Sequence, residues 1–162
     1  LERRLRELSI TDELTGLFNQ RHFGERLAAE AVRARRMRQD LSLILIDLDR
    51  FKEANDRFGH LHGDSILRAT ASLLRAAIRK DVDMAFRYGG DEFMLLLPGV
   101  GREAAGRIAD RLRSAVPHQP YARLVTLSVG MATLRPRERA ESLLKRADRR
   151  MYADKKARKA RR

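Results

Sequence analysis

The sequence lacks cysteine and any long hydrophobic run, and aromatic residues make up only 6% of its 162 positions. The absence of cysteine excludes disulfide bonds and thiolate metal ligands, and it fits a reducing compartment. The longest apolar runs, "LSLILI" at 41–46 and "FMLLLP" at 93–98, are as long as strands, whereas a bilayer-spanning helix needs about 20 apolar residues. The first ten residues, "LERRLRELSI", are charged and periodic, unlike a signal peptide. The sequence therefore predicts a cytoplasmic domain with no membrane-spanning segment.

The positive charge of the chain has two interpretations. Its 35 lysines and arginines against 22 acids give a formal net charge of +13, and a basic surface attracts nucleic-acid phosphates. Arginine is nevertheless spread over the whole sequence, with one dense cluster, "KKARKARR", at 155–162. Aromatic residues are not interleaved with the charges as base stacking requires. We therefore expect an arginine-rich solvated surface and a phosphate-bearing ligand, with no nucleic acid as the partner.

Length and composition are those of one soluble domain. Hydrophobic residues make up 43% and charged residues 35% of the 162 positions, and a domain of about 150 residues buries about 70% of its unfolded surface. Hydrophobic periodicity predicts helices at about 20–37, 51–58, 63–80, 101–115 and 138–156, and strands at 41–49, 83–88, 92–97 and within 121–134. This order predicts an α/β fold with a mixed, mostly antiparallel central sheet flanked by helices, of ferredoxin-like plan.

The first residues of the chain are expected to be helical. Leu1, Leu5 and Leu8 have the spacing of a helix that continues upstream as a coiled coil, and a frayed helical end has the same pattern. In the next helix, at 20–37, the spacing of the apolar residues predicts a buried face made of Phe23, Leu27, Ala31 and Val32.

Two pairs of acids lie at predicted strand ends. Asp47 and Asp49 follow "LSLILI", and Asp91 and Glu92 follow two adjacent glycines in "FRYGGDEFMLLLPG". The glycines predict a hairpin turn with positive φ. If the strands are neighbours, Asp47 and Asp91 meet across the sheet, where two carboxylates repel unless a cation lies between them. Since Mg²⁺ commonly uses one or two carboxylates with substrate phosphates, the acids indicate a metal site, with ordinary polar turn residues as the alternative.

Polar residues after the first strand could bind an anion and a purine. Lys52 lies in the first turn of the helix predicted in "DRFKEAND", where backbone N–H groups attract anions; a lysine on a solvated helix face has the same pattern. The amide of Asn55 and the carboxylate of Asp64 have the donors and acceptors that read a purine edge. Each is also a common helix cap, and Asp64 in "HGDSIL" has the position of an N-cap.

Several motifs stand in a fixed order along the chain: "DELTGLFNQRHF", "LILIDLDRFKEANDRFGHLHGDSIL", "FRYGGDEFMLLLPG", "LSVGMA" and "LLKRADRRMYADKK". Their order and approximate spacing resemble those of the GGDEF domain, the catalytic domain of diguanylate cyclases. The resemblance covers residues 11–156, with 1–10 as the end of a helical stalk and 157–162 as a basic tail. It implies a fold similar to nucleotidyl cyclases and the polymerase palm, and the condensation of two GTP molecules into cyclic di-GMP with release of two pyrophosphates.

The resemblance also implies a role for individual residues. Asp47, Asp91 and the backbone carbonyl of Leu48 would hold Mg²⁺, with Mn²⁺ as an alternative metal. Asp91 would accept the proton of the ribose 3′-hydroxyl, with Glu92 assisting at the metal. The substrate-binding residues implied are Lys52 for the phosphates, Phe51, Asn55 and Asp64 for the guanine nucleotide, and Lys155 and Lys159 for the terminal phosphates.

The chain departs from the family pattern at two places. The product-inhibition motif of the family is Arg-x-x-Asp, whereas residues 80–83 read "KDVD", and lysine lacks the planar fork of arginine. Asp83 is retained and Arg111 matches a secondary inhibitory contact, so this site is degenerate and we expect weakened or absent feedback inhibition. Near its end the chain lacks the Gly-Arg-Asn segment of the family, so Lys159 is only a positional substitute for a phosphate-binding arginine.

The resemblance further implies partners. Each site holds one GTP and the product joins two, so two copies of the domain must face each other as a homodimer. The helix at 1–8 would link the domain to an upstream sensory or regulatory domain, and the chain would be a fragment of a longer protein. The alternative is a GGDEF module that binds GTP or cyclic di-GMP as a sensor without turnover, against which stand the intact Asp47, Lys52, Asn55, Asp64, Asp91 and Glu92.

Overall fold

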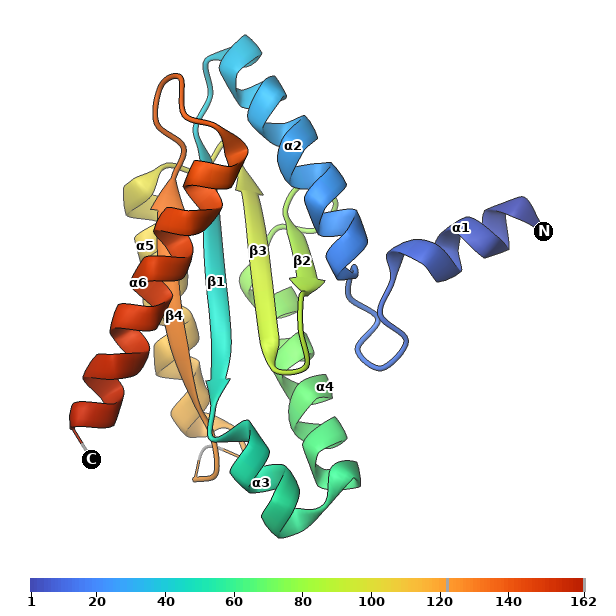
Figure 1. Ribbon diagram of the computed structural model, residues 1–162, viewed down its shortest axis with the longest axis vertical. Helices are drawn as coiled ribbons and strands as arrows, with labels where there is room; N and C mark the ends of the chain where they lie inside the picture. The colour runs from blue at the N-terminus through green and yellow to red at the C-terminus, as the bar shows by residue number, and fades with distance from the viewer. Residues whose placement is uncertain (122, 162) are drawn as a thin grey trace.

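The computed structural model describes the backbone of residues 1–121 and 123–161 and, within these, all side chains except those of residues 6–8 and 117. A four-stranded sheet forms the centre, and helices cover both of its faces (Figure 1). The elements, in chain order, are α1 (Glu2–Ile10), α2 (Gln20–Met37), β1 (Leu41–Asp49), α3 (Phe51–Phe58), α4 (His60–Ala77), β2 (Met84–Arg87), β3 (Glu92–Pro98), α5 (Arg102–Ala115), the 3₁₀ turn η1 (Val116–His118), β4 (Thr126–Thr133) and α6 (Ala140–Ala160).

The sheet has the strand order β2-β3-β1-β4, and each neighbouring pair is antiparallel. The predicted α/β class with helices flanking a mostly antiparallel sheet is therefore confirmed. The parallel contribution is small: among the described residues it consists of one isolated bridge between Phe18 and Phe86. The segment 121–134 forms one strand, β4, rather than two.

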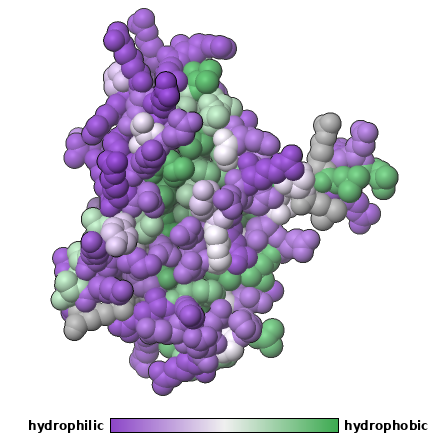
Figure 2. All heavy atoms as spheres, viewed as in Figure 1, coloured by the Kyte–Doolittle hydropathy of each residue, from purple (hydrophilic) through white to green (hydrophobic). Residues whose placement is uncertain are grey.

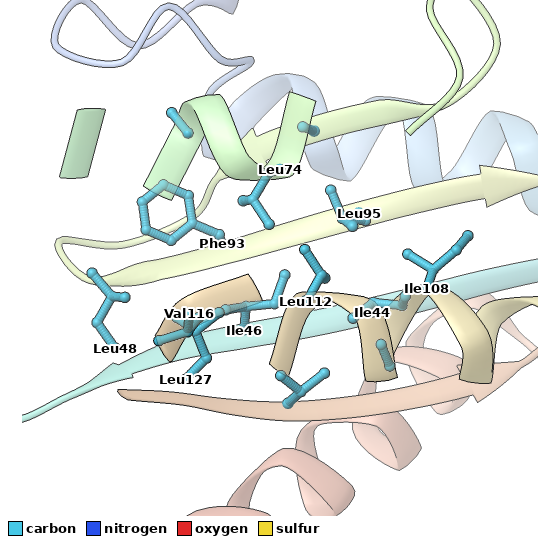
Figure 3. Close-up of a cluster of buried hydrophobic side chains, with 14 of the residues drawn as sticks. Ile44, Ile46, Leu48, Leu74, Phe93, Leu95, Ile108, Leu112, Val116 and Leu127 are labelled. Carbon is cyan, nitrogen blue, oxygen red and sulfur yellow. The ribbon is translucent and has the colours of Figure 1, made fainter. Parts of the chain in front are cut away.

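β1 is buried at every position because helices cover both faces of the sheet at this strand. Successive side chains of a strand point to opposite faces. Ile44, Ile46 and Leu48 pack with residues of α4 and α5, as Figure 3 shows. Leu43 and Leu45 pack on the other side with residues of α2 and α6. By the same alternation, Asp47 lies on the face covered by α2 and α6, at the point where the strand ends.

The outer surface is mostly hydrophilic on the face shown in Figure 2, in agreement with the expected arginine-rich surface. Hydrophobic residues gather between α2 and α6, where pockets of 300 and 750 Å³ share Tyr88 and Leu144 in their walls. In the described part of the chain, no helix is long and apolar enough to cross a bilayer.

α1 extends away from the body of the domain (Figure 1). Leu1 and Leu5 are exposed on it, and the side chain of Leu8 lies outside the described residues. The helix itself agrees with the sequence, whereas its role as the end of a stalk remains a prediction.

Several details of the helices differ from the expectations. In α2, Val32 is exposed and the buried position is taken by Glu30, whose carboxylate accepts a hydrogen bond of 2.6 Å from Arg26. α4 begins at His60, so Asp64 lies inside the helix and is not its N-cap. α6 continues to Ala160, so most of the predicted basic tail is helical.

Candidate functional site

The acids at the strand ends come together at one end of the sheet. The end of β1 pairs with the start of β3, and the turn between β2 and β3 lies toward the lower end of the sheet in Figure 1. The register places Asp47 opposite Glu92, so the expectation that Asp47 directly faces Asp91 is wrong by one residue. Asp91 precedes the strand, and its backbone carbonyl accepts a hydrogen bond of 3.0 Å from the N–H of Leu48.

Asp47 is the most buried of these carboxylates, with 4% of its surface exposed. Its Oδ2 accepts a hydrogen bond of 2.5 Å from Nζ of Lys155. Its Oδ1 is buried and, within the described part of the chain, has no hydrogen-bond partner. Burial raises the pKa of Asp47, the hydrogen bond from Lys155 opposes this shift, and the charge of Asp91 adds to it. A buried, unpaired carboxylate oxygen is costly unless a cation or donor meets it.

Glu92 adds a further negative charge to this cluster. Burial raises its pKa, and the charges of Asp47, Asp91 and Asp148 raise it further. The preceding turn makes room for the side chain: a Cβ on Gly89 would lie 3.2 Å from Oε2 of Glu92. Neither glycine of the turn has a positive φ. The expected conformational role of the glycines is therefore wrong, and the role of Gly89 is steric.

These residues fit a hard divalent cation. Among the described residues there is no group of three or more histidines, cysteines, aspartates and glutamates arranged as a complete metal site. Mg²⁺ does not require one, because it commonly binds one or two carboxylates and takes its remaining ligands from water and phosphate. Oxygen ligands of this kind could come from Asp47, whose Oδ1 has no hydrogen-bond partner among the described residues, from the neighbouring Asp91 and from the backbone of Leu48.

Asp49 has a different function from its neighbour. Its carboxylate accepts hydrogen bonds of 2.7 Å from Oγ1 of Thr126 and 2.6 Å from Oγ of Ser128. Both hydroxyls belong to the start of β4, so Asp49 fixes the end of β1 to the next strand and positions Asp47. The sequence shows a second acid after β1 but does not show that its partners lie so far along the chain.

A second group of polar residues lies where α3 packs against α4. Oδ1 of Asn55 is buried and unpaired within residues 1–121 and 123–161. It lies so close to Gly63 that a Cβ at that position would be only 1.8 Å away. Asp64 follows directly and is partly buried, and Phe51 begins α3 and packs on the core. The sequence motifs do not identify Gly63 as part of this group, although a glycine inside a helix indicates a close approach.

The lysines of the site differ in their surroundings. Lys52 is exposed in the first turn of α3. Lys155 contacts Asp47 directly and joins α6 to the acids. Lys159 is exposed one helical turn further along α6. The structure therefore brings Lys155 to the acids, while Lys52 and Lys159 extend into solvent.

The expected inhibitory site is reorganised. Asp83 is buried, and Arg79 binds its carboxylate with two hydrogen bonds, of 3.0 Å from Nε and 2.7 Å from Nη2. Lys80 is exposed. Arg79, Asp83 and Arg111 line a pocket of 730 Å³. Asp83 and Arg111 therefore line the same pocket, but Arg79, the neighbour of Lys80, already pairs with the carboxylate of Asp83.

The sheet is antiparallel and covered by helices, and its central strand pair ends in a cluster of acids. Together with the polar residues between α3 and α4, this arrangement is that of the palm-like class of nucleotidyl cyclases. Residues 9–161 match the family model described as "Diguanylate cyclase, GGDEF domain". The chain belongs to this family.

Curated relatives agree with this assignment. The chain is 39% identical over 157 residues to diguanylate cyclase DgcP of Pseudomonas aeruginosa, covering 94% of this chain and 23% of that protein. It is 40% identical over 154 residues to the response regulator PleD of Caulobacter vibrioides, covering 90% of this chain and 34% of that protein. The chain thus spans about a quarter to a third of the length of these relatives.

Solved structures show the same fold. The coiled coil and GGDEF domain of DgcB from Caulobacter crescentus, in complex with c-di-GMP, matches with a TM-score of 0.90 at 28% identity, over 96% of this chain and 85% of that one. Diguanylate cyclase SiaD from Pseudomonas aeruginosa, in complex with its activator SiaC, matches with a TM-score of 0.87 at 37% identity, over 96% of this chain and 62% of that one.

Proposed function

We propose that this chain is the catalytic domain of a diguanylate cyclase, which condenses two GTP molecules into cyclic di-GMP and releases two pyrophosphates. The observation that carries the proposal is the buried Oδ1 of Asp47, which lies among acids at the end of the sheet and has no hydrogen-bond partner in the part of the chain that the structure describes. A site of this kind within a family of diguanylate cyclases fits a metal-bound triphosphate better than any ligand without charge.

Each residue has a role in this reaction. Asp47, Asp91 and the carbonyl of Leu48 would hold Mg²⁺ or Mn²⁺, which when bound neutralises charge on the α-phosphate. Asp91 takes the proton of the 3′-hydroxyl; the 3′-oxygen forms a bond to the α-phosphorus of the other GTP, and the bond from that phosphorus to pyrophosphate breaks. Glu92 keeps the site negative beside the metal. Phosphoryl transfer requires mainly positioning and charge stabilisation from the protein.

The remaining residues bind the nucleotide. The amide of Asn55 donates and accepts hydrogen bonds at the guanine edge, and the carboxylate of Asp64 accepts them. The absence of a Cβ on Gly63 leaves room for the side chain of Asn55. Phe51, at the start of α3, packs against the hydrophobic core and would contact the guanine nucleotide from there. The cations that neutralise the phosphates are Lys52, Lys155 and Lys159.

Two copies of the domain are required, because each binds one GTP and the product joins two. A homodimer would be set by the segment upstream of α1, where a sensory or regulatory domain is expected. Cyclic di-GMP is expected to bind weakly at the degenerate inhibitory site, since Arg79 satisfies Asp83 and Lys80 lacks a planar fork. The alternative of a sensor that binds without turnover has no support in the acids, which are all present.

The test is incubation of the chain with GTP and Mg²⁺ and identification of the product by mass spectrometry. We expect cyclic di-GMP from the unmodified chain and from Asp110→Ala, an exposed acid on α5, and none from Asp91→Ala. No cyclic dinucleotide, even after fusion to a strong dimerisation domain, would contradict the proposed function. Equal product from Asp91→Ala would contradict the assigned mechanism and leave the family unaffected.

A further inference from the structure

Lys155 occupies an unusual position for a residue expected to bind phosphate. Its Nζ lies 2.5 Å from Oδ2 of Asp47, on a carboxylate that is 6% exposed in its side chain, while the side chain of Lys155 is 38% exposed. The ammonium group therefore neutralises the buried acid that the metal needs. In this state it competes with a divalent cation for the same carboxylate.

The acids around Lys155 act on it together. The hydrogen bond to Asp47 raises the pKa of Lys155, and the charges of Asp49 and Asp91 act in the same direction. A divalent ion at Asp47 would lie within a few ångströms of the ammonium group and repel it. Metal binding at Asp47 therefore opposes the contact with Lys155, and the loss of this contact costs least when another anion receives the ammonium group.

The neighbouring cations on α6 are held elsewhere. Nζ of Lys156 lies 4.8 Å from the centroid of the Tyr152 ring, and Arg158 pairs with Asp154 at 3.3 Å. Lys155 has a flexible four-carbon stem and a partly exposed side chain. It can turn from Asp47 toward solvent without a movement of the helix.

We propose that Lys155 makes the binding of metal and of triphosphate depend on each other. In the free domain Lys155 donates a hydrogen bond to Asp47. When a metal–triphosphate complex binds, Asp47 would become a ligand of the metal and Lys155 would bind the phosphates. The site thereby selects the metal–triphosphate complex over the free metal ion. By linkage, each ligand then strengthens the binding of the other. This inference rests on the proposed function only in taking a triphosphate as the ligand.

Lys155→Met tests the proposal, with Lys156→Met as a control of equal charge change on the adjacent residue. Mn²⁺ binding without nucleotide is measured by electron paramagnetic resonance, and binding of a non-hydrolysable GTP analogue with Mn²⁺ by calorimetry. Lys155→Met is expected to bind Mn²⁺ alone about tenfold more tightly than the unmodified chain. It is expected to bind the Mn²⁺–nucleotide complex about tenfold more weakly, so that the two dissociation constants shift in opposite directions. Lys156→Met is expected to behave as the unmodified chain in both measurements.

Equal or weaker binding of Mn²⁺ alone to a folded Lys155→Met would overturn the proposal. The unmodified chain gives an independent test by NMR of its lysine ammonium groups. The signal of Lys155 is expected to exchange slowly with water in the metal-free domain and to change on addition of Mg²⁺ with the GTP analogue; fast exchange in the metal-free domain would overturn the proposal. Neither measurement depends on turnover, so failure of the proposed function would be seen separately, as absence of cyclic di-GMP.

Discussion

Gly63→Ala would test the proposed role of Asn55 in guanine binding through a single methyl group. The added Cβ would lie 1.8 Å from Oδ1 of Asn55 and 2.8 Å from its Cγ, distances that no pair of atoms can keep. The amide of Asn55 must therefore rotate away from its place beside α4. The backbone of α4 can remain, because alanine favours a helix over glycine by about 0.5–1 kcal/mol.

The size of the effect follows from the proposed hydrogen bonds between Asn55 and guanine, which the rotated amide could no longer form. Leaving a buried polar group unpaired costs about 1–3 kcal/mol, and each 1.4 kcal/mol is about a tenfold change in affinity. We therefore expect Gly63→Ala to bind a GTP analogue about 5- to 150-fold more weakly, with little change in the free energy of unfolding.

Calorimetry with the GTP analogue and urea unfolding measure the two quantities. Gly24→Ala in α2 is the control, since its Cβ would meet no atom within 4 Å. In an Asn55→Ala background, Gly63→Ala should add little, because the displaced amide is already absent. Unchanged nucleotide affinity in Gly63→Ala would refute the proposed role of Asn55 in guanine binding.

Other predictions concern the acids and the inhibitory site. Burial and neighbouring charges raise the pKa of Glu92. The ionisation of Glu92 therefore costs stability in the folded state, and this stability is lost as pH rises from the ordinary pKa of a glutamate through the raised pKa. Glu92→Gln should therefore raise the free energy of unfolding of the metal-free domain above that of the unmodified chain, and this gain should be larger at pH 7.5 than at pH 5 when measured with urea. Glu103→Gln, on an exposed face, should give no such gain, and a lower free energy of unfolding in Glu92→Gln at pH 7.5 would contradict the prediction. Asp49→Ala should destabilise the fold by about 1–3 kcal/mol for each hydroxyl of β4 left unpaired, also seen in urea, and a neutral effect would show that Asp49 does not fix β4. Micromolar cyclic di-GMP should leave turnover of the unmodified chain unchanged in a pyrophosphate-release assay and should slow Lys80→Arg more; strong inhibition of the unmodified chain would show that Asp83 is available after all.

Much of the fold follows from local pattern. The uninterrupted apolar run at 41–46 predicts a strand covered on both faces, and β1 is buried throughout. The helical repeat from Gln20 to Met37 gives the bounds of α2. The predicted buried face is wrong at Val32, which lies about half a turn away from Phe23 and is exposed. Glu30 lies on the buried face instead and pairs with Arg26, a contact that hydrophobicity alone does not predict.

The site follows from the sequence in its residues but not in its contacts. The spacing of the acids places them at neighbouring strand ends, whereas the register that pairs Asp47 with Glu92 depends on how the strands dock. The partners of Asp49 and the contact of Lys155 with Asp47 join residues 77 to 108 positions apart. Such pairs arise from tertiary packing, which no local pattern records. Asp64 is a further example: its position in "HGDSIL" predicts a helix cap, but α4 begins earlier, at His60, so Asp64 lies inside the helix.

The central claim is that two copies of this site together convert GTP. It is tested most directly by measuring the initial rate of cyclic di-GMP formation per chain over a range of chain concentrations, with the dimer fraction determined by analytical ultracentrifugation at each concentration. The rate per chain should follow the dimer fraction and should rise at low concentration when a dimeric coiled coil is fused before Leu1. Full-rate product formation by a monomeric population, or no cyclic di-GMP from a population shown to be dimeric, would contradict the account.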